Sequence, residues 1–314
     1  MLGLFARSMF EATRIFPLSG ADRGPGRLQD DTPTRSDRPT SRRQRFQQLH
    51  RGEDLFVMPN AWDAGTARIL ERLGFPALAT TSAGLAFAMG VRDSSSCLSR
   101  RVVLENARAI MQATGLPVSA DLEDGFGPSP EDCARTIREA EAIGLCGGAI
   151  EDATGDRAAP IHAVDLAVAR IRAVVAARRD PAFLITARAE NYICGRPDLQ
   201  DTIRRLQAFE AAGADVVYAP GLLDIETIRR VCASVTVPVN VVVGLTPAPY
   251  TLNDLARAGV RRVSTGGSLA RAALGEVMRA AAELTGPGTF SYADRALPDA
   301  EASALMRHVP RAAR

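Results

Sequence analysis

Eight short apolar segments recur along the chain from Leu55 onward, and a stretch of helical periodicity separates each from the next. Ser129 or Asp132 could cap one of these helices, and Gly144 and Gly213 are positioned to stop two of them. Strand and helix repeated eight times in alternation predict a parallel (β/α)8 barrel of the TIM type. A doubly wound open sheet is the alternative, but its glycine-rich first turn is missing. The predicted strands are Phe56–Ala61, Ala77–Ser82, Pro117–Glu123, Gly147–Glu151, Phe183–Ala189, Asp215–Ala219, Pro238–Val243 and Arg262–Thr265.

The two ends of the chain differ from this repeat. Residues 1–48 contain "GADRGPGRLQDDTPTRSDRPTSRRQR", which offers little apolar surface to bury, and we predict a disordered N-terminal extension there. Residues 49–314 are expected to form the barrel catalytic domain with a C-terminal helical arm. The arm consists of "SLARAALGEVMRAAAEL" and "FSYADRALPDAEASALMRH", which supply more helix than one barrel needs.

The basic residues narrow the possible chemistry. All 38 of them are arginine, so the chain has no lysine. Schiff-base aldolases, pyridoxal phosphate enzymes and Walker-type nucleotide loops are excluded, because each requires a lysine. Of the three histidines, only His162 falls in a core loop. Carboxylates, arginines or a bound metal must therefore carry most of any catalytic chemistry.

The remaining averages are those of an ordinary globular chain. A net charge of +2 gives no indication of a nucleic-acid partner. No apolar run reaches the roughly 18 residues that a membrane span requires. The five cysteines are scattered without the spacing of a zinc site or a disulfide framework. We therefore expect a cytoplasmic protein that contacts neither nucleic acid nor membrane.

Acidic residues gather where three of the predicted strands end, which is where TIM barrels hold their active sites. In "VSADLEDGFG", alternation along the strand predicts that Asp121 and Glu123 share one face, roughly 7 Å apart. Glu151 ends the next strand, and Arg188 and Glu190 end the one after it. Unpaired acids at one mouth would repel one another and raise their own pKa values. A divalent cation would relieve that repulsion, and oxygen ligands favour Mg²⁺, with Mn²⁺ as a substitute.

Simpler explanations remain open for single residues. An aspartate at a strand end commonly caps a helix or forms a loop salt bridge, which accounts for Asp63, Asp124 or Asp152 taken alone. Arg188 could serve only to neutralise the acids around it.

Several motifs, taken in order, resemble a known superfamily. The segments "PNAWDAGTARILERLGFPALATTSAGLA", "GVRDSSS", "ADLEDGFG", "AIEDATG" and "TARAE" have the order and spacing seen in the isocitrate lyase and phosphoenolpyruvate mutase superfamily. The resemblance extends from about Leu55 to the C-terminal "YADRALPDAEASALM". It implies an α/β barrel whose last helix swaps between subunits, giving a homodimer or homotetramer. It also implies Mg²⁺ dependence and a small carboxylic acid substrate, a 2-oxo acid handled as its enolate.

The resemblance also assigns roles to individual residues. It makes Asp121 the direct metal ligand, with Glu123 and Glu151 holding the metal through water, although many members have aspartate at the position of Glu123. The other implied residues are Arg188, which binds the oxo-acid oxygens; Asp93 and Glu190, which join Arg188 as candidate catalytic groups; Ser82, Ala83 and Gly84, whose hydroxyl and amides hold the substrate carboxylate; and Asn60, which lines the substrate site.

One loop departs from the superfamily pattern. Isocitrate and methylisocitrate lyases resemble each other in a "KKCGH" stretch after strand four, whereas this chain reads "EDATGDRAAPIHAVD", without cysteine or lysine. Phosphoenolpyruvate mutases and phosphonopyruvate hydrolases share "GVRDS" but carry lysine and asparagine on that loop. The sequence therefore predicts a lyase that cleaves a C–C bond of a 2-oxo or 2-hydroxy di- or tricarboxylic acid, such as a substituted malate or oxaloacetate. A P–C bond enzyme is the alternative.

The sequence leaves two other classes of function open. Gly266 and Gly267 precede a helix after the last strand, where many barrels hold phosphate, which would indicate a phosphosugar isomerase or synthase. A paralogue that binds a ligand without turnover is the third possibility. Cys194, in the loop after strand five, could supply a thiol but is more simply a small loop residue.

Overall fold

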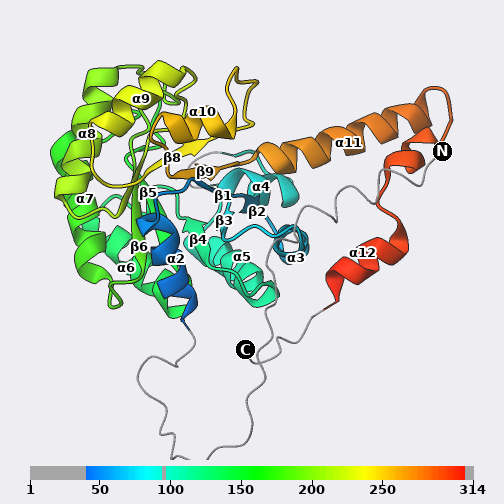
Figure 1. The fold of residues 1–314 in the computed structure, drawn as a ribbon, viewed down its shortest axis with the longest axis horizontal. Coiled ribbons are helices and arrows are strands. Elements are labelled where there is room, and N and C mark those ends of the chain that lie inside the picture. Colours follow the sequence, from blue (N-terminus) through cyan, green and yellow to red (C-terminus); the bar gives the residue numbers. More distant parts are fainter. Residues whose placement is uncertain (1–39, 94–96, 308–314) are drawn as a thin grey trace, which may run out of the picture. The chain divides into compact units, whose positions relative to one another are not determined.

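The computed structural model describes residues 40–93 and 97–307 (Figure 1). These residues form a nearly closed barrel of parallel strands with helices around it, which confirms the predicted TIM-type fold. Most of the predicted extension, residues 1–39, lies outside the described part of the chain. Among the described helices, none is long and apolar enough to cross a membrane.

The sheet follows the order β1-β9-β8-β7-β6-β5-β4-β3-β2. β1 and β2 are two parts of one predicted strand, interrupted at Pro59, which has no N–H to give to a ladder. The carbonyl of Pro59 still accepts a hydrogen bond from the backbone N–H of Ala79 at 2.9 Å. The nine strands therefore occupy the eight predicted positions. They are β1 Phe56–Met58, β2 Asn60–Ala61, β3 Leu78–Thr80, β4 Val118–Asp121, β5 Gly147–Glu151, β6 Leu184–Arg188, β7 Val216–Tyr218, β8 Val239–Val242 and β9 Arg262–Ser264.

Helix boundaries follow the capping chemistry in the sequence. Ser129 and Asp132 cap α6 reciprocally, because each side chain accepts a hydrogen bond from the backbone N–H of the other. Gly144 and Gly213 follow α6 and α8 with φ of +93° and +97°, a left-handed conformation that favours glycine. The helices are α2 Arg42–Arg51, α3 Ala64–Arg72, α4 Ser82–Ala88, α5 Arg100–Ala113, α6 Pro130–Ala142, α7 Val164–Ala177, α8 Leu199–Ala211, α9 Ile225–Ala233, α10 Leu252–Arg257, α11 Ser268–Thr285 and α12 Asp299–Met306, with a 3-10 turn η2 at Ser291–Arg295.

Helix α2 belongs to the folded unit, although the predicted domain boundary at residue 48 cuts through it. Phe46 of α2 is fully buried in a cluster with Phe56, Met58 and Leu184 from β1 and β6. Two hydrophobic residues, Phe46 and Leu49, in a basic segment were too weak a signal to predict this contact. The compact unit therefore starts at residue 40.

Helix α11 leaves the barrel after β9 and projects away from it (Figure 1). Ala270 is the one buried residue among its 18. The chain then turns back, and α12 packs against α3, where the guanidinium of Arg68 donates a hydrogen bond to the carbonyl of Met306. The predicted surplus of helix is thus present, and most of α11 lies outside the core.

Candidate active site

A cavity of about 440 Å³ lies within the barrel and opens where the strands end. Six of the ten predicted site residues line it: Asn60, Ser82, Ala83, Asp93, Asp121 and Arg188. Tyr218, Asn240 and Arg262 line it as well, and none of these three was predicted. A polar residue on a short apolar barrel strand was the signal in the sequence that could have identified them.

Arg188 lies at the centre of the acidic residues. Its Nη1 is 3.0 Å from Asp121 Oδ1 and 2.7 Å from Glu151 Oε1, and its Nε is 2.8 Å from Glu190 Oε1. The guanidinium carbon lies 5.0 Å from the centre of the Tyr218 ring, a cation–π contact. The sequence predicted that a divalent cation would separate the acids, but the structure shows that Arg188 itself provides much of that neutralisation.

Burial sets the protonation behaviour of this group. Burial raises the pKa of Glu151 well above its usual value, against the opposing effect of Arg188. Burial alone would lower the pKa of Arg188, but Glu151, Glu190 and Asp121 hold it above its usual value. The pKa of Asp93 is raised by burial and by the neighbouring charge of Asp121. The single positive charge of Arg188 therefore does not remove all of the repulsion among the carboxylates around it.

Glu190 is fully buried and holds Arg188 from the side away from the cavity. Its second oxygen accepts from Arg188 Nη2 at 3.3 Å, and its backbone N–H donates to Asp152 Oδ1 at 2.8 Å. Asp152 is itself held by Arg205 Nη1 at 3.0 Å. Glu190 was predicted as a catalytic residue, but the structure favours a role in positioning the Arg188 side chain.

Replacing Glu190 with glutamine should change how stability depends on pH. Burial raises the pKa of Glu190 from 4.5 to about 7, so the folded protein retains a proton that the unfolded chain has released. Its contribution to stability is present below pH 4.5 and is lost as the pH rises through 7. Urea unfolding at pH 5 and pH 8 should therefore show a smaller decline for Glu190→Gln than for the wild type. An equal or steeper decline in the variant would contradict this account of Glu190.

Glu123 does not lie where strand alternation predicted. β4 ends at Asp121, and Glu123 occupies a tight turn with φ +48°, in the left-handed region. The turn is held from α7, where Arg170 Nη1 donates to the carbonyls of Gly127 and Pro128 at 2.9 Å each. The prediction that Asp121 and Glu123 share one strand face is therefore wrong. Glu123 is buried, and it is absent from the cavity lining.

The residues predicted to hold the substrate carboxylate have mixed roles. Ser82 faces the cavity, with its hydroxyl 3.1 Å from Asp121 Oδ2. The N–H of Gly84 already donates to Thr81 Oγ1 at 3.2 Å, and a Cβ at Gly84 would lie 2.6 Å from the Thr81 methyl carbon. The structure thus gives Gly84 a packing role in place of the predicted ligand contact.

The side chain of Asn60 in β2 is hydrogen-bonded to the turn that follows β9. Its Oδ1 accepts from the backbone N–H groups of Thr265 and Gly266 at 2.9 Å each, and its Nδ2 donates to Thr80 O at 2.6 Å. Asn60 also lines the cavity, so its predicted contact with the substrate stays a prediction. The same bonds occupy the N–H of Gly266, which weakens the case for a phosphate site before α11.

The acids fit a metal held mainly through water. No group of three or more acidic, histidine or cysteine side chains in residues 40–93 and 97–307 could hold a metal ion by itself. Asp121 lines the cavity, whereas Glu123 and Glu151 are not among the residues that line it. One carboxylate ligand with a surrounding shell of waters and acids is a mode that suits Mg²⁺.

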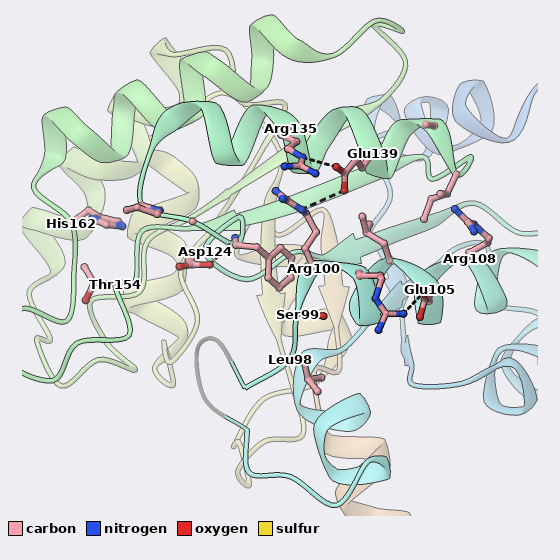
Figure 2. Close-up of a pocket in the computed structure, with 17 residues that line it drawn as sticks. Leu98, Ser99, Arg100, Glu105, Arg108, Asp124, Arg135, Glu139, Thr154 and His162 are labelled. Carbon is pink, nitrogen blue, oxygen red and sulfur yellow. Dashed lines mark hydrogen bonds and ion pairs between the residues drawn. The ribbon is translucent and has the colours of Figure 1, made fainter.

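A larger groove of about 1020 Å³ lies outside the barrel mouth, between α5 and α6 (Figure 2). Its main charges are already paired, because Arg100 and Arg135 contact Glu139 at 3.4 and 2.8 Å. Asp124 lines this groove, and its Oδ1 accepts from the N–H of Phe126 at 2.9 Å. Asp124 therefore serves the turn through this hydrogen bond, which is neither the helix cap nor the salt bridge that the simpler explanation supposed.

Comparisons with known proteins agree with this geometry. The family model for phosphoenolpyruvate phosphomutase matches residues 46–285. An oxaloacetate decarboxylase of Paraburkholderia xenovorans is 28% identical over 282 residues, covering 87% of this chain and 86% of the relative. A crystal structure from Burkholderia cenocepacia, provisionally described as a lyase or mutase, is 50% identical, with a TM-score of 0.81 over 84% of this chain and 94% of that one. A phosphonopyruvate hydrolase complexed with oxalate and Mg²⁺ is 28% identical, with a TM-score of 0.76 and coverage of 85% and 94%.

Proposed function

The chain belongs to the isocitrate lyase and phosphoenolpyruvate mutase superfamily, and on that premise we propose that it is a Mg²⁺-dependent lyase. The reaction is cleavage of a C–C bond in a 2-oxo or 2-hydroxy di- or tricarboxylic acid, with an enolate as intermediate. The observation that carries the proposal is the cavity with Asp121 and Arg188 on its wall, backed by Glu151 and Glu190.

The residues of the chain have distinct parts in this reaction. Arg188 presents a planar cation to the oxo-acid oxygens and stabilises the negative charge that develops on them. Asp121 would hold the metal directly, and Glu123 and Glu151 would hold its water shell. When bound, Mg²⁺ supplies further positive charge beside the enolate oxygen. Ser82 orients Asp121 through the hydroxyl contact already described, so that one carboxylate oxygen keeps a fixed direction.

Cys194 is a poor candidate for the acid or base. Burial and the nearby acids raise the pKa of its thiol to about 11, so the thiolate is scarce at neutral pH. Ile193, its neighbour, lines the cavity. The raised pKa of the Cys194 thiol favours a decarboxylase, or a lyase that acts on an oxo- or hydroxy-diacid, over a lyase that needs a loop cysteine. The P–C bond reaction remains the second candidate, supported by the likeness to phosphonopyruvate hydrolase.

A coupled assay for released pyruvate or other 2-oxo acids tests the proposal. Oxaloacetate, a panel of substituted malates and phosphonopyruvate would each be supplied with Mg²⁺ and with chelator. We expect metal-dependent release from a diacid and competitive inhibition by oxalate, which mimics the enolate. Release from phosphonopyruvate alone would assign the P–C reaction instead. Indifference to oxalate would contradict the enolate mechanism, and inhibition by inorganic phosphate would favour the isomerase class.

We also propose that α11 swaps onto a second copy of the chain. Its large apolar side chains Leu274, Val277 and Met278 are 44, 65 and 73% exposed, which is an unusual state for an unpartnered helix. Exchange of an identical element between two subunits would cover them and give a homodimer or homotetramer.

Truncation after Gly288 should damage the protein. The shortened chain lacks α12 and its contact with α3, and it leaves the end of α11 without support. We expect aggregation, or a loss of cooperative unfolding, measured by light scattering and thermal denaturation beside the full chain. A monodisperse, active monomer from the truncated chain would refute the swap.

A further inference from the structure

Arg262 is a buried cation whose partners carry no charge. Its side chain donates from Nε to Asn240 Oδ1 at 2.8 Å and from Nη2 to Thr186 Oγ1 at 3.0 Å, and Nη1 lies 3.2 Å from His50 Nε2. His50 accepts there as a neutral ring, because its Nδ1 lies 2.8 Å from the carbonyl of Phe46 and must carry the proton. Burial accordingly lowers the pKa of His50 to about 3 and that of Arg262 to about 9.

The position of Arg262 relates it to the cavity. In the strand register Arg188 pairs with Tyr218, Tyr218 with Asn240, and Asn240 with Arg262, so one row of residues crosses β6 to β9. Arg188 is the last residue of β6, whereas Arg262 is the first residue of β9. Because the strands of a barrel are tilted, a row of paired residues that starts at the mouth shifts toward the opposite end of the barrel. Arg262 nevertheless lines the same cavity as Arg188 and Asp121. The cavity therefore has an outer end with acids and an inner end with an arginine.

The inner end also offers hydroxyl donors. The hydroxyls of Ser119 and Tyr218 make no hydrogen bond with other described residues, although only 4 and 9% of these residues is exposed. Ser264 accepts from Asn240 Nδ2 at 2.9 Å, which leaves its own O–H free to donate. Neither the Ser119 hydroxyl nor the Tyr218 hydroxyl is among the fully buried, unpartnered side-chain atoms of the described residues, so each is open to the cavity, where a ligand or water can satisfy it. A buried cation surrounded by free donors is the chemistry of an anion site.

We propose that the inner end of the cavity is a second anion subsite, in which Arg262, Ser119, Tyr218 and Ser264 bind a carboxylate of the substrate. This inference rests on the proposed function and narrows it to extended dicarboxylic acids. The reacting end lies at Asp121 and Arg188, and the second carboxylate points inward past the Tyr218 ring. The ring then separates the two carboxylates, since its face already contacts Arg188.

Binding measurements on the full-length protein test this subsite. Oxalate probes the outer end, and succinate and glutarate probe both ends. Isothermal titration in the presence of Mg²⁺ should show that Arg262→Gln weakens succinate or glutarate binding by about 10- to 100-fold, the usual effect of losing hydrogen bonds to a charged partner. Oxalate affinity should change far less. Arg261→Gln is the matched control, because Arg261 instead donates to the carbonyl of Glu53.

Two further variants keep the subsite testable if Arg262→Gln does not fold. Tyr218→Phe and Ser119→Ala each remove one hydroxyl and keep the remaining side chain, so each should weaken the longer acids and spare oxalate. The subsite is overturned if succinate and glutarate fail to bind the wild type, or bind all these variants as tightly as the wild type. The variants could lose affinity for succinate and glutarate alone while the wild type releases no 2-oxo acid from any substrate in the coupled assay. That result would uphold the subsite and overturn the proposed lyase reaction.

Discussion

Replacing Asp121 with asparagine should reduce Mg²⁺-dependent turnover by more than about 100-fold, beyond the 10- to 100-fold that outer-shell changes typically cost. Asparagine keeps the shape of the side chain and removes its charge. Asp121 is the acid that both lines the cavity and contacts Arg188, at 3.0 Å, so its charge acts directly on the reacting end. Steady-state rates across a Mg²⁺ titration would measure the loss and show whether added metal restores activity.

Two companion variants make this prediction specific. Glu151→Gln should cost less than Asp121→Asn, because Glu151 is not among the residues that line the cavity and would act through its contact with Arg188. Asp124→Asn is the matched control, a neighbouring aspartate whose carboxylate accepts from Phe126 beside the outer groove. Near-normal rates for Asp121→Asn at low Mg²⁺, or a larger loss for Asp124→Asn, would refute the metal assignment.

The barrel could be predicted from sequence because its signal is repeated. Each strand is a short apolar run buried on both faces, and each helix has its own caps and stops, so errors of a few residues did not change the fold. The predicted segment Gly147–Glu151 matches β5, whereas Pro117–Glu123 was too long by one residue at its start and by two at its end. Even there the barrel position of the strand was right.

The site was harder to predict because its geometry depends on contacts between distant segments. Strand alternation was applied to Glu123, but the chain leaves the strand at Asp121, and Glu123 itself is left-handed. Arg170 holds the turn that follows through the carbonyls of Gly127 and Pro128. Arg262 was overlooked because its role depends on His50, 212 positions away in α2. Residue types at the strand ends were therefore enough to predict where the mouth of the barrel lies. The residues at the inner end of the cavity could be identified only from the three-dimensional structure.

Arg188→Lys should reduce kcat/KM by about 100-fold or more, although the charge is conserved. The guanidinium contacts Asp121 and Glu151 through Nη1 and Glu190 through Nε. An ammonium is a single point charge and cannot reproduce that planar fork. Losing two charge-assisted hydrogen bonds, at roughly 1.5–3 kcal/mol each, accounts for a factor of that size. Arg135→Lys, whose partner Glu139 lies in the outer groove, is the matched control.

Arg188→Met should separate this catalytic role from the structural one. Removing one partner of a buried ion pair typically costs about 3–5 kcal/mol, and here several carboxylates lose the same partner. Glu151 and Glu190 already have raised pKa values, and without the arginine both would rise further. Protonation at low pH would then relieve the repulsion, so the loss of stability relative to the wild type should be larger at pH 8 than at pH 5. Urea unfolding of both proteins at the two pH values measures this difference. A loss of stability independent of pH would mean that Arg188 acts there mainly by packing against Tyr218, and the electrostatic account of the site would have to be given up.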